Sequence, residues 1–290
     1  MSQTYILFHE NCADGTASAL TAYLKFGEDA IYIPVQYNQP LPDLKPKSTV
    51  YVLDFCYPRQ FLDDLIDTYN QDVIVLDHHK TAQEALLGYS KLKDSVFDMT
   101  KSGAILSWEY FHPADPVPSL FYYIQDRDLW QWKYPQTKFI SAYLSAVGFN
   151  NFRDWIPFLE ESNLDNIIDK GEAISEYQDK SASSNGEKFY EGILPDGTIM
   201  WMLNNQHLIS DTCHKFLIAN ENIKVCCCWF VVDGSKVVFS FRSKQEFDCS
   251  EIAKKLGGGG HKNAAGASVN LTEKTIPKAR LLTSQHSVQK

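Results

Sequence analysis

The stretch Val73-Ile74-Val75-Leu76-Asp77-His78-His79 passes from four apolar residues directly to three ionisable ones. A short apolar run rich in β-branched residues is typical of a strand that is covered on both faces of a sheet. Ligands of open α/β sheets bind outside the carboxyl ends of such strands. The stretch therefore predicts an α/β fold with a metal and phosphate site where this strand ends.

Two further apolar runs end in polar residues of the same kinds. They are residues 5–8, which lead to His9, Cys12 and Asp14, and residues 50–53, which lead to Asp54. His and Asp are ligand types that hard or borderline divalent cations prefer. Three neighbouring strand ends are therefore predicted to share one site.

The first part of the chain alternates between strand-like and helix-like segments. We expect strands at 4–8, 30–34, 49–53 and 72–76, and helices at about 14–26 and 58–69. Such alternation implies a parallel sheet with right-handed crossovers. From Ser102 to about Ser184, apolar residues recur at helical spacing, which predicts a helical extension of this first domain.

The small and polar segment 181–186, SASSNG, is the best candidate for a domain boundary. After it we expect a smaller α/β domain with strands near 198–203, 225–232 and 236–242, and helices near 210–219 and 249–255. Asp233-Gly234 predicts a hairpin between two of these strands. The predicted organisation is a first domain at 1–184, a second domain at 185–272 and a tail at 273–290.

The composition is that of an ordinary globular chain. Its 290 residues and 44% hydrophobic content can form two domains with at least one large core. The net charge of -9 argues against a protein that coats long duplex nucleic acid, but it allows a small phosphorylated substrate. The sequence shows no secretion signal and no apolar run near the ~18 residues of a membrane helix, so we expect a cytoplasmic protein that binds no membrane.

The seven cysteines lack a CxxC pair and form no recognisable disulfide or zinc framework. Cys226, Cys227 and Cys228 lie in an apolar run, where free thiols pack as small hydrophobic residues. Cys12 is the exception, because it lies among the candidate metal ligands.

Two motifs carry a family resemblance. The Asp77-His78-His79 tripeptide, together with the other acidic strand ends, resembles the DHH phosphoesterase superfamily of RecJ-type exonucleases, nanoRNases, cyclic-dinucleotide phosphodiesterases and family II pyrophosphatases. The segment 257–266, GGGGHKNAAG, is similar to the glycine-rich motif of the DHHA1 substrate-binding domain. The resemblance implies a parallel-sheet DHH domain with a helical extension, linked to a smaller α/β DHHA1 domain.

The chemistry of phosphate ester cleavage gives the strand-end residues expected roles. Cleavage needs neutralisation of the phosphoryl oxygens and an activated water, and a pair of metal ions supplies both. Asp54, on the middle strand end, is the candidate bridge between the ions, in agreement with the family pattern. His78 is expected to bind a metal as neutral imidazole, with Asp77 fixing its ring orientation. The resemblance places His79 beside the scissile phosphate.

The last metal ligand comes from the segment Gln125-Asp126-Arg127-Asp128. By resemblance Asp126 matches the final metal-binding Asp of the family. Asp128 is the competing choice, and a surface carboxylate paired with Arg127 is the alternative to a ligand. The expected metal ligands are thus His9, Asp14, Asp54, His78 and Asp126.

The first motif departs from the family pattern. Relatives of the nanoRNase type show His followed by two Asp separated by one residue, whereas this chain has Cys12 at the first position and Asp14 at the second. The resemblance implies two Mn²⁺ or Mg²⁺ ions. The first, with His9, Asp54 and either Cys12 or a water as ligands, would be held less firmly. A thiolate would shift the preference towards manganese, iron or zinc, while the alternative is a spectator thiol.

The glycine-rich motif is expected to bind substrate. Glycines leave no Cβ between backbone and ligand, so the N–H groups of Gly258, Gly259 and Gly260 can approach phosphate or sugar oxygens. His261 can donate to a phosphate, and Arg242 matches the family's phosphate-binding Arg, which could bind bidentately.

Two other features have simpler interpretations. Ser102 is expected to be the N-cap of a helix that begins at Gly103. Trp130 and Trp132 are either core residues or a platform for a base, and the core interpretation is favoured.

The leading hypothesis is a metal-dependent phosphodiesterase acting on short oligonucleotides or small nucleotides, with 3′–5′ exonuclease activity among the options. The enzymatic alternative is a cyclic-dinucleotide or phosphomonoester hydrolase. A nucleotide-binding regulatory protein with weak hydrolysis is an alternative of another class, suggested by the missing first Asp. The sequence leaves the oligomeric state open.

Overall fold

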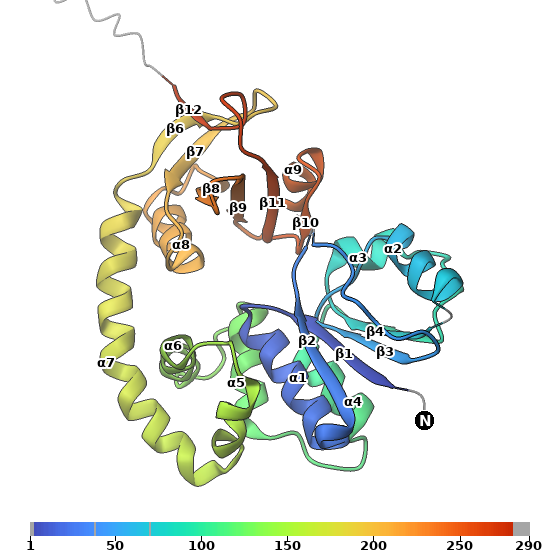
Figure 1. Cartoon of the computed structure of the whole chain (residues 1–290). Helices are drawn as coiled ribbons and strands as arrows, with labels where there is room; N and C mark the ends of the chain where they lie inside the picture. The colour runs from blue at the N-terminus through green and yellow to red at the C-terminus, as the bar shows by residue number, and fades with distance from the viewer. Residues whose placement is uncertain (1–2, 38, 70, 281–290) are drawn as a thin grey trace, which may run out of the picture. The chain divides into compact units, whose positions relative to one another are not determined.

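The computed structural model describes residues 3–37, 39–69 and 71–280. The chain divides into two compact units, residues 1–177 and 178–290. The long helix α7, Glu161–Gly186, runs through this division (Figure 1), and the sequence-based boundary after residue 184 falls in its last turn. Among the described residues, no helix is long and apolar enough to cross a membrane.

The first unit contains a five-stranded, fully parallel sheet. Its strands are β1 Thr4–His9, β2 Ala30–Val35, β3 Thr49–Leu53, β4 Asp72–Asp77 and β5 Asp94–Phe97, in the order β2-β1-β3-β4-β5. The predicted α/β fold with a parallel sheet is confirmed. Sequence reasoning missed β5 because this edge strand is partly exposed and lacks the continuous apolar run of a buried strand.

Both faces of this sheet are covered, as the apolar strands predict. Alternate residues of β1 enter different cores: Ile6 and Phe8 join one hydrophobic cluster, while Tyr5 and Leu7 join the other. The helices flanking the strands are α1 Ala13–Phe26, α2 Arg59–Asp63, which continues as a π-helical turn at Asp64–Thr68, and α3 Lys80–Ala85. The polar ends of the strands are thereby held on a rigid, doubly covered sheet.

The predicted helical extension is present in the first unit. It consists of α4 Gly103–Phe111, α5 Ser119–Asp128, α6 Thr137–Val147, a 3₁₀ segment at Phe152–Leu159 and the first part of α7. Helix α4 lies beside α1 (Figure 1) and shares its core, in which Trp155 is fully buried. Ser102 is the N-cap of α4, as predicted, because its hydroxyl accepts from the Ile105 N–H at 3.4 Å.

The second unit contains a mixed seven-stranded sheet with the order β10-β11-β9-β8-β7-β6-β12. The strands are β6 Tyr190–Ile193, β7 Ile199–Asn204, β8 Val225–Val232, β9 Lys236–Ser243, β10 Gly259–Gly260, β11 Ala264–Asn270 and β12 Lys278–Ala279; the helices are α8 Ile209–Ala219 and α9 Ser250–Lys255. Only β7 and β8 pair in parallel. The predicted hairpin joins β8 and β9, with positive φ at both Asp233 and Gly234.

The three consecutive cysteines of β8 pack in the interior, as predicted. Cys227 belongs to the hydrophobic cluster on one face of the sheet, whereas Cys226 and Cys228 belong to the cluster on the other face. All three are fully buried and free. The alternation follows from the period of two residues in a strand.

Part of the expected tail belongs to the sheet instead. Strand β12 pairs with β6, and the Arg280 N–H donates to the Glu191 carbonyl at 2.8 Å. A two-residue edge strand, here Lys278 and Ala279, is too short to show a periodicity that could reveal it. The rest of the expected tail, 281–290, lies outside the described residues.

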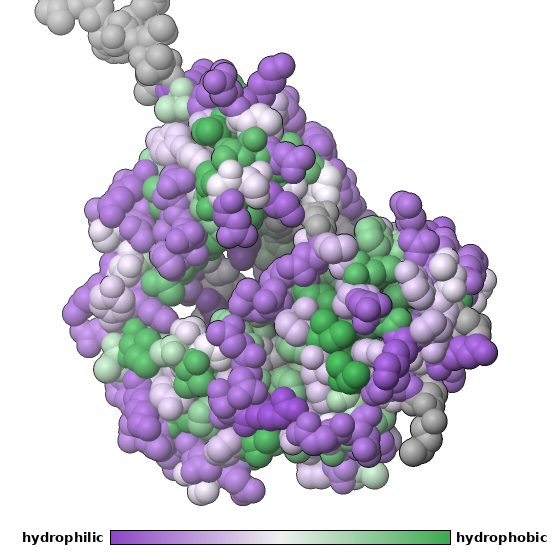
Figure 2. Space-filling view, viewed as in Figure 1, coloured by the Kyte–Doolittle hydropathy of each residue, from purple (hydrophilic) through white to green (hydrophobic). Residues whose placement is uncertain are grey.

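The surface is mixed in character. On the face seen in Figure 2, hydrophobic residues lie in separate patches among hydrophilic ones. Scattered apolar residues are normal on globular proteins and identify no functional surface by themselves. The function of the chain is therefore sought in its buried polar groups.

Candidate metal centre

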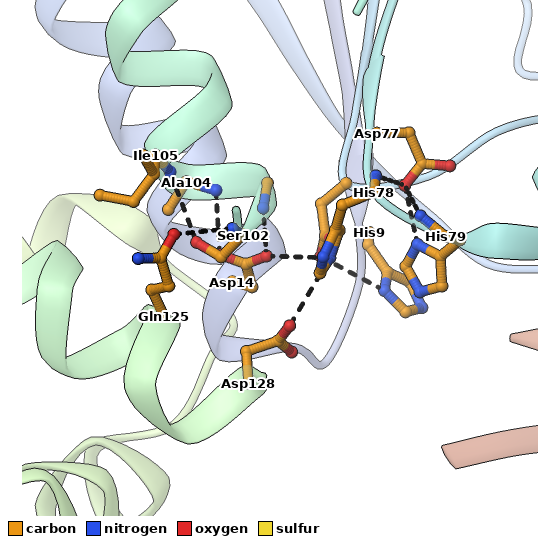
Figure 3. Close-up of polar contacts among 12 residues, drawn as sticks. His9, Asp14, Asp77, His78, His79, Ser102, Ala104, Ile105, Gln125 and Asp128 are labelled. Carbon is orange, nitrogen blue, oxygen red and sulfur yellow. Dashed lines mark hydrogen bonds and ion pairs between the residues drawn. The ribbon is translucent and has the colours of Figure 1, made fainter. Parts of the chain in front are cut away.

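The parallel strands bring the predicted polar residues together in the first unit. His9 is the last residue of β1, Asp54 follows β3, and Asp77 ends β4. Asp14 lies in the first turn of α1. Because neighbouring parallel strands end at the same edge of the sheet, these side chains converge there, as Figure 3 shows for His9, Asp14 and His78.

His78 lies at the centre of three carboxylates. Its Nε2 atom is 3.0 Å from Oδ1 of Asp54, 3.3 Å from Oδ2 of Asp14 and 3.6 Å from Oδ2 of Asp128. The imidazole is 1% exposed. Burial alone would lower the pKa of His78, but these carboxylates raise it well above its usual value. The cluster carries an excess of negative charge that favours any cation placed within it.

Asp54 lies between two imidazoles. Its Oδ1 faces His78, and its Oδ2 is 3.5 Å from Nδ1 of His9. Burial would raise the pKa of Asp54, but its hydrogen bond with His78 and the nearby imidazole of His9 hold the pKa well below its usual value. The backbone of Asp54 has a φ of 54°, a left-handed conformation that costs about 1–3 kcal/mol in a residue with a side chain. The fold retains this strained residue where its carboxylate can serve two partners.

Asp14 is fixed by the beginning of helix α4. Its Oδ2 accepts from the Gly103 N–H at 2.5 Å, and its Oδ1 accepts from the Ala104 N–H at 2.9 Å (Figure 3). A carboxylate at a helix N-terminus is stabilised by the helix dipole and by these donors. A Cβ on Gly103 would lie 2.6 Å from Cβ of Asp54, so only glycine fits. Sequence reasoning identified this helix start but missed its role in holding Asp14.

The structure corrects the assignment of the last carboxylate. Asp126 is not part of the cluster, because its oxygens accept from the Lys133 N–H at 2.8 Å, the Tyr134 N–H at 3.1 Å and the Thr137 hydroxyl at 2.6 Å. Asp128 joins Asp14 and His78 instead. Asp126 and Asp128 are two residues apart on α5, and at about 100° per residue their side chains project in nearly opposite directions. Burial and the nearby Asp14 and Asp54, opposed by His78, raise the pKa of Asp128 to about 7.

Asp126 therefore anchors the loop after α5. Trp130 and Trp132 lie in this loop, and they were expected to be core residues. Trp130 and Trp132 both have positive φ, and Trp132 is 37% exposed. The Arg127 guanidinium lies 4.3 Å from the ring of Trp130 and 4.9 Å from that of Trp132. The pair forms a cation–π cluster at the surface rather than a part of the core.

The structure also corrects the partner of Asp77. Its Oδ1 accepts from Nδ1 of His79 at 2.7 Å and from the backbone N–H of His78 at 2.8 Å. Asp77 thus orients the ring of His79, not that of His78. Burial opposes the charged form of His79, but Asp77 raises its pKa above the usual value.

Cys12 lies within the centre. Its Sγ, a ring nitrogen of His9 and a carboxylate oxygen of Asp54 all lie within 4.8 Å of one another. Burial, followed by the charges of Asp54, Asp128 and Asp14, raises the pKa of the thiol well above its usual value. The donor atoms of Asp14, His78 and Asp128 form a second such group.

These residues fit divalent metal ions. Among the described residues, no hydrogen bond satisfies the buried Nδ1 of His9, Oδ2 of Asp54 or Oδ2 of Asp128. Buried polar atoms without partners are rare and each costs about 1–3 kcal/mol, so they indicate a missing ligand. Nitrogen, carboxylate and thiol donors in groups of three match the preferences of first-row transition cations.

The glycine-rich motif lies in the second unit, next to Arg242. Strand β11, which follows the motif's glycines, pairs with β9 so that Ala264 lies opposite Arg242. The Arg242 guanidinium donates to Ser210 Oγ at 2.9 and 3.1 Å and to Ser240 Oγ at 3.0 Å. Most of its donors thus serve contacts within the unit.

The structure gives the glycines of this motif different tasks. The Gly258 N–H donates to the Ala253 carbonyl at 2.9 Å, and a Cβ there would lie 2.0 Å from the Gly266 oxygen. The N–H of Gly258 therefore closes the turn after α9, and the absence of a side chain allows close packing on β11. This N–H was predicted to donate to a phosphate, but here it is bonded within the unit. Gly259 and Gly260 form β10, and the half-buried His261 follows, with its N–H donating to the Ala264 carbonyl.

Known proteins resemble this chain in both sequence and fold. Protein R106 of Acanthamoeba polyphaga mimivirus is 32% identical over 294 residues, which cover 94% of this chain and 69% of R106, so the two belong to one family. RecJ of Thermus thermophilus in complex with Mn²⁺ superposes with a TM-score of 0.49 at 14% identity, covering 92% of this chain and 49% of RecJ. PggH, a pGpG-specific phosphodiesterase from Vibrio cholerae, gives a TM-score of 0.46 at 11% identity and covers 93% of this chain and 94% of that one.

A family model provides the remaining comparison. Residues 206–281 match the DHHA1 domain, and this range contains both Arg242 and the glycine-rich motif. The match lies downstream of the parallel-sheet unit, in which Asp77-His78-His79 ends a buried strand. The predicted resemblance is confirmed for the second domain: the chain contains a DHHA1 domain and belongs to the same family as R106.

Proposed function

We propose that the chain is a metal-dependent phosphoesterase that hydrolyses phosphodiester bonds in short oligonucleotides or small nucleotides. The observation that carries this proposal is the convergence of Asp14, Asp54 and Asp128 on the buried His78. Such an accumulation of carboxylates without compensating cations is costly unless metal ions occupy it. The resemblance of Asp77-His78-His79 and of the DHHA1 domain to phosphoesterases supports hydrolysis as the reaction.

Two divalent ions are proposed, with Mn²⁺ or Mg²⁺ as candidates for the reaction. One would be held by His9 and Asp54, with Cys12 beside them, and the other by Asp14, His78 and Asp128. Asp54 can contribute to both, because its two oxygens face His78 and His9 separately. When bound, such ions neutralise phosphoryl oxygens and lower the pKa of water.

Two residues of the protein, His79 and Asp77, are proposed to orient the phosphoryl group and to offset its charge. Asp77 accepts from Nδ1 of His79, which fixes the ring and favours its charged form. We propose that His79 binds the phosphoryl group of the substrate and stabilises its negative charge. A histidine oriented by a carboxylate in this way loses little conformational freedom when substrate binds.

We propose that the second unit binds substrate through Arg242, Gly259, Gly260 and His261. Register places Arg242 and the motif on adjacent strands of one sheet. The net charge of -9 favours a small substrate over a long strand, because an acidic molecule repels an extended phosphate backbone.

The proposal is tested by timed digestion of end-labelled RNA and DNA, from dinucleotides to longer oligomers, together with cyclic dinucleotides and a nucleoside bisphosphate. Reactions contain Mn²⁺, Mg²⁺ or EDTA. We expect cleavage of the shortest diesters with either metal and none with EDTA. Asp54→Asn should lower the rate at least ~100-fold, whereas Asp115→Asn, at an exposed position, should not.

The same assay separates the alternatives. Preferential cleavage of cyclic dinucleotides or of the bisphosphate would identify a cyclic-dinucleotide or phosphomonoester hydrolase instead. Tight dinucleotide binding without cleavage under any divalent metal would instead identify a nucleotide-binding protein. A wild-type rate for Asp54→Asn with manganese would refute the proposed centre.

A further inference from the structure

The two ligand groups of the centre differ in donor type. Asp14, His78 and Asp128 offer only oxygen and nitrogen, whereas His9, Cys12 and Asp54 include sulfur. Thiolate is a soft ligand that selects zinc and similar cations, while carboxylate suits Mg²⁺ and Mn²⁺. This difference in donor atoms is a property of the side chains themselves and does not depend on which substrate the centre cleaves.

The start of helix α1 does not require a cysteine at position 12. Cys12 occupies the N-cap of α1, where Ser, Thr, Asp or Asn would normally accept from the helix N–H groups. The Cys12 side chain makes no capping hydrogen bond of ordinary geometry, and its contact with the Gly15 N–H uses sulfur, which is a weak acceptor. An Asp or Ser would therefore serve the helix better, so the helix does not account for a cysteine here.

A comparison with the other cysteines argues against a spectator thiol. Each of the other six packs within a hydrophobic cluster: Cys56, Cys213, Cys226, Cys227, Cys228 and Cys249. Cys12 belongs to none of these clusters and lies instead among His9 and three carboxylates. Its surroundings are those of a ligand rather than of a small hydrophobic residue.

Two buried atoms beside Cys12, Nδ1 of His9 and Oδ2 of Asp54, face each other at 3.5 Å without forming a hydrogen bond. Asp54 is 1% exposed, and its Oδ2 has no hydrogen bond among the described residues. Nδ1 of His9 is likewise buried without a hydrogen bond. One cation would satisfy these atoms and the thiol together.

We propose that the centre holds two unlike cations, with His9, Cys12 and Asp54 forming a thiolate site that selects a borderline cation such as Zn²⁺. Asp14, His78 and Asp128 form the site for Mn²⁺ or Mg²⁺. On binding, the Cys12 thiol releases its proton to water and a sulfur–metal bond forms, with no change of oxidation state. The inference deepens the proposed function and rests on it only for the presence of metal at this centre.

Cobalt provides a direct test, because Co²⁺ bound to thiolate absorbs in the near ultraviolet and Co²⁺ bound only to oxygen and nitrogen does not. The full-length protein, stripped of metal with a chelator, is titrated with Co²⁺ and its spectrum is recorded. We expect the sulfur–cobalt band in the wild-type protein and its loss in Cys12→Ser and Cys12→Asp. Cys249→Ala, which removes a thiol from a hydrophobic cluster, should keep the band.

Competition between metals gives a second readout. After incubation with equal Zn²⁺ and Mn²⁺, the wild-type protein should retain one equivalent of zinc, and Cys12→Asp should exchange it for manganese. Two bound Co²⁺ ions without the band, a band that persists in Cys12→Ser, or failure of the folded protein to bind Co²⁺ would each overturn the inference. If the wild-type protein hydrolyses a substrate but shows no sulfur–cobalt band, only the thiolate site is refuted. If it shows the band but hydrolyses no substrate, only the proposed function is refuted.

Discussion

The candidate metal centre and the glycine-rich motif both contain many polar groups, but the two regions differ in how these groups are hydrogen-bonded. In the centre, buried atoms of His9, Asp54 and Asp128 have no hydrogen-bond partner among the described residues. In the motif region, Arg242 and the Gly258 N–H are bonded within their own unit. Unpartnered buried atoms imply a ligand, whereas satisfied ones imply a role in the fold. The two regions therefore call for different responses to mutation.

The largest expected effect separates Asp128 from Asp126. Asp128→Asn should lower turnover at least ~100-fold and reduce metal content, because it removes a charge that faces His78. Asp126→Asn should leave metal content near normal and lower the stability by about 1–3 kcal/mol, because it weakens the anchoring of the loop. Metal analysis and thermal unfolding of both variants distinguish them. Loss of metal from Asp126→Asn alone would restore the sequence-based assignment.

Two glycine substitutions sharpen the comparison at the level of packing. Gly103→Ala pushes a methyl group into Asp54 and should impair both metal content and activity. Gly258→Ala pushes one into β11 and should destabilise the second unit by about 1–3 kcal/mol or more, with metal content unchanged. Gly186→Ala is the control, because a Cβ there makes only ordinary contacts, the nearest at 3.4 Å, and the backbone φ is not positive. Equal metal loss in both variants would contradict the separation.

A smaller effect is expected from the carboxylate that orients His79. Asp77→Asn should lower the rate by about 10–100-fold, because His79 loses the acceptor for its Nδ1 proton. The number of bound metal ions should not change. Asp72→Asn, at an exposed position of the same strand, is the control. Loss of a metal ion from Asp77→Asn would instead make Asp77 a ligand.

The smallest effect tests the surface aromatic cluster. Trp132→Leu should lower the stability by less than about 1 kcal/mol, because it removes only a partly exposed contact with Arg127. Trp155→Leu, in the core, should cost several-fold more. Chemical denaturation of both variants gives the comparison. Similar losses would mean that Trp132 belongs to the core after all.

Sequence patterns anticipated the sheet because their physical cause is local. Apolar runs of β-branched residues form buried strands wherever they occur, and parallel pairing then places His9, Asp54 and His78 at one edge. The edge strands β5 and β12 escaped this reasoning, since partly exposed strands need no continuous apolar run.

The sequence by itself determined the α/β fold, the strand ends that supply ligands and the unusual cysteine among them. Only the tertiary structure decided which of two nearby carboxylates enters the centre, because the conformation of the loop after α5 lets Tyr134 and Thr137 bind Asp126 and leaves Asp128 to His78. It also decided that Asp77 orients His79 and that α4 holds Asp14. Such choices depend on the directions of side chains and on partners far along the chain, which a linear pattern does not contain.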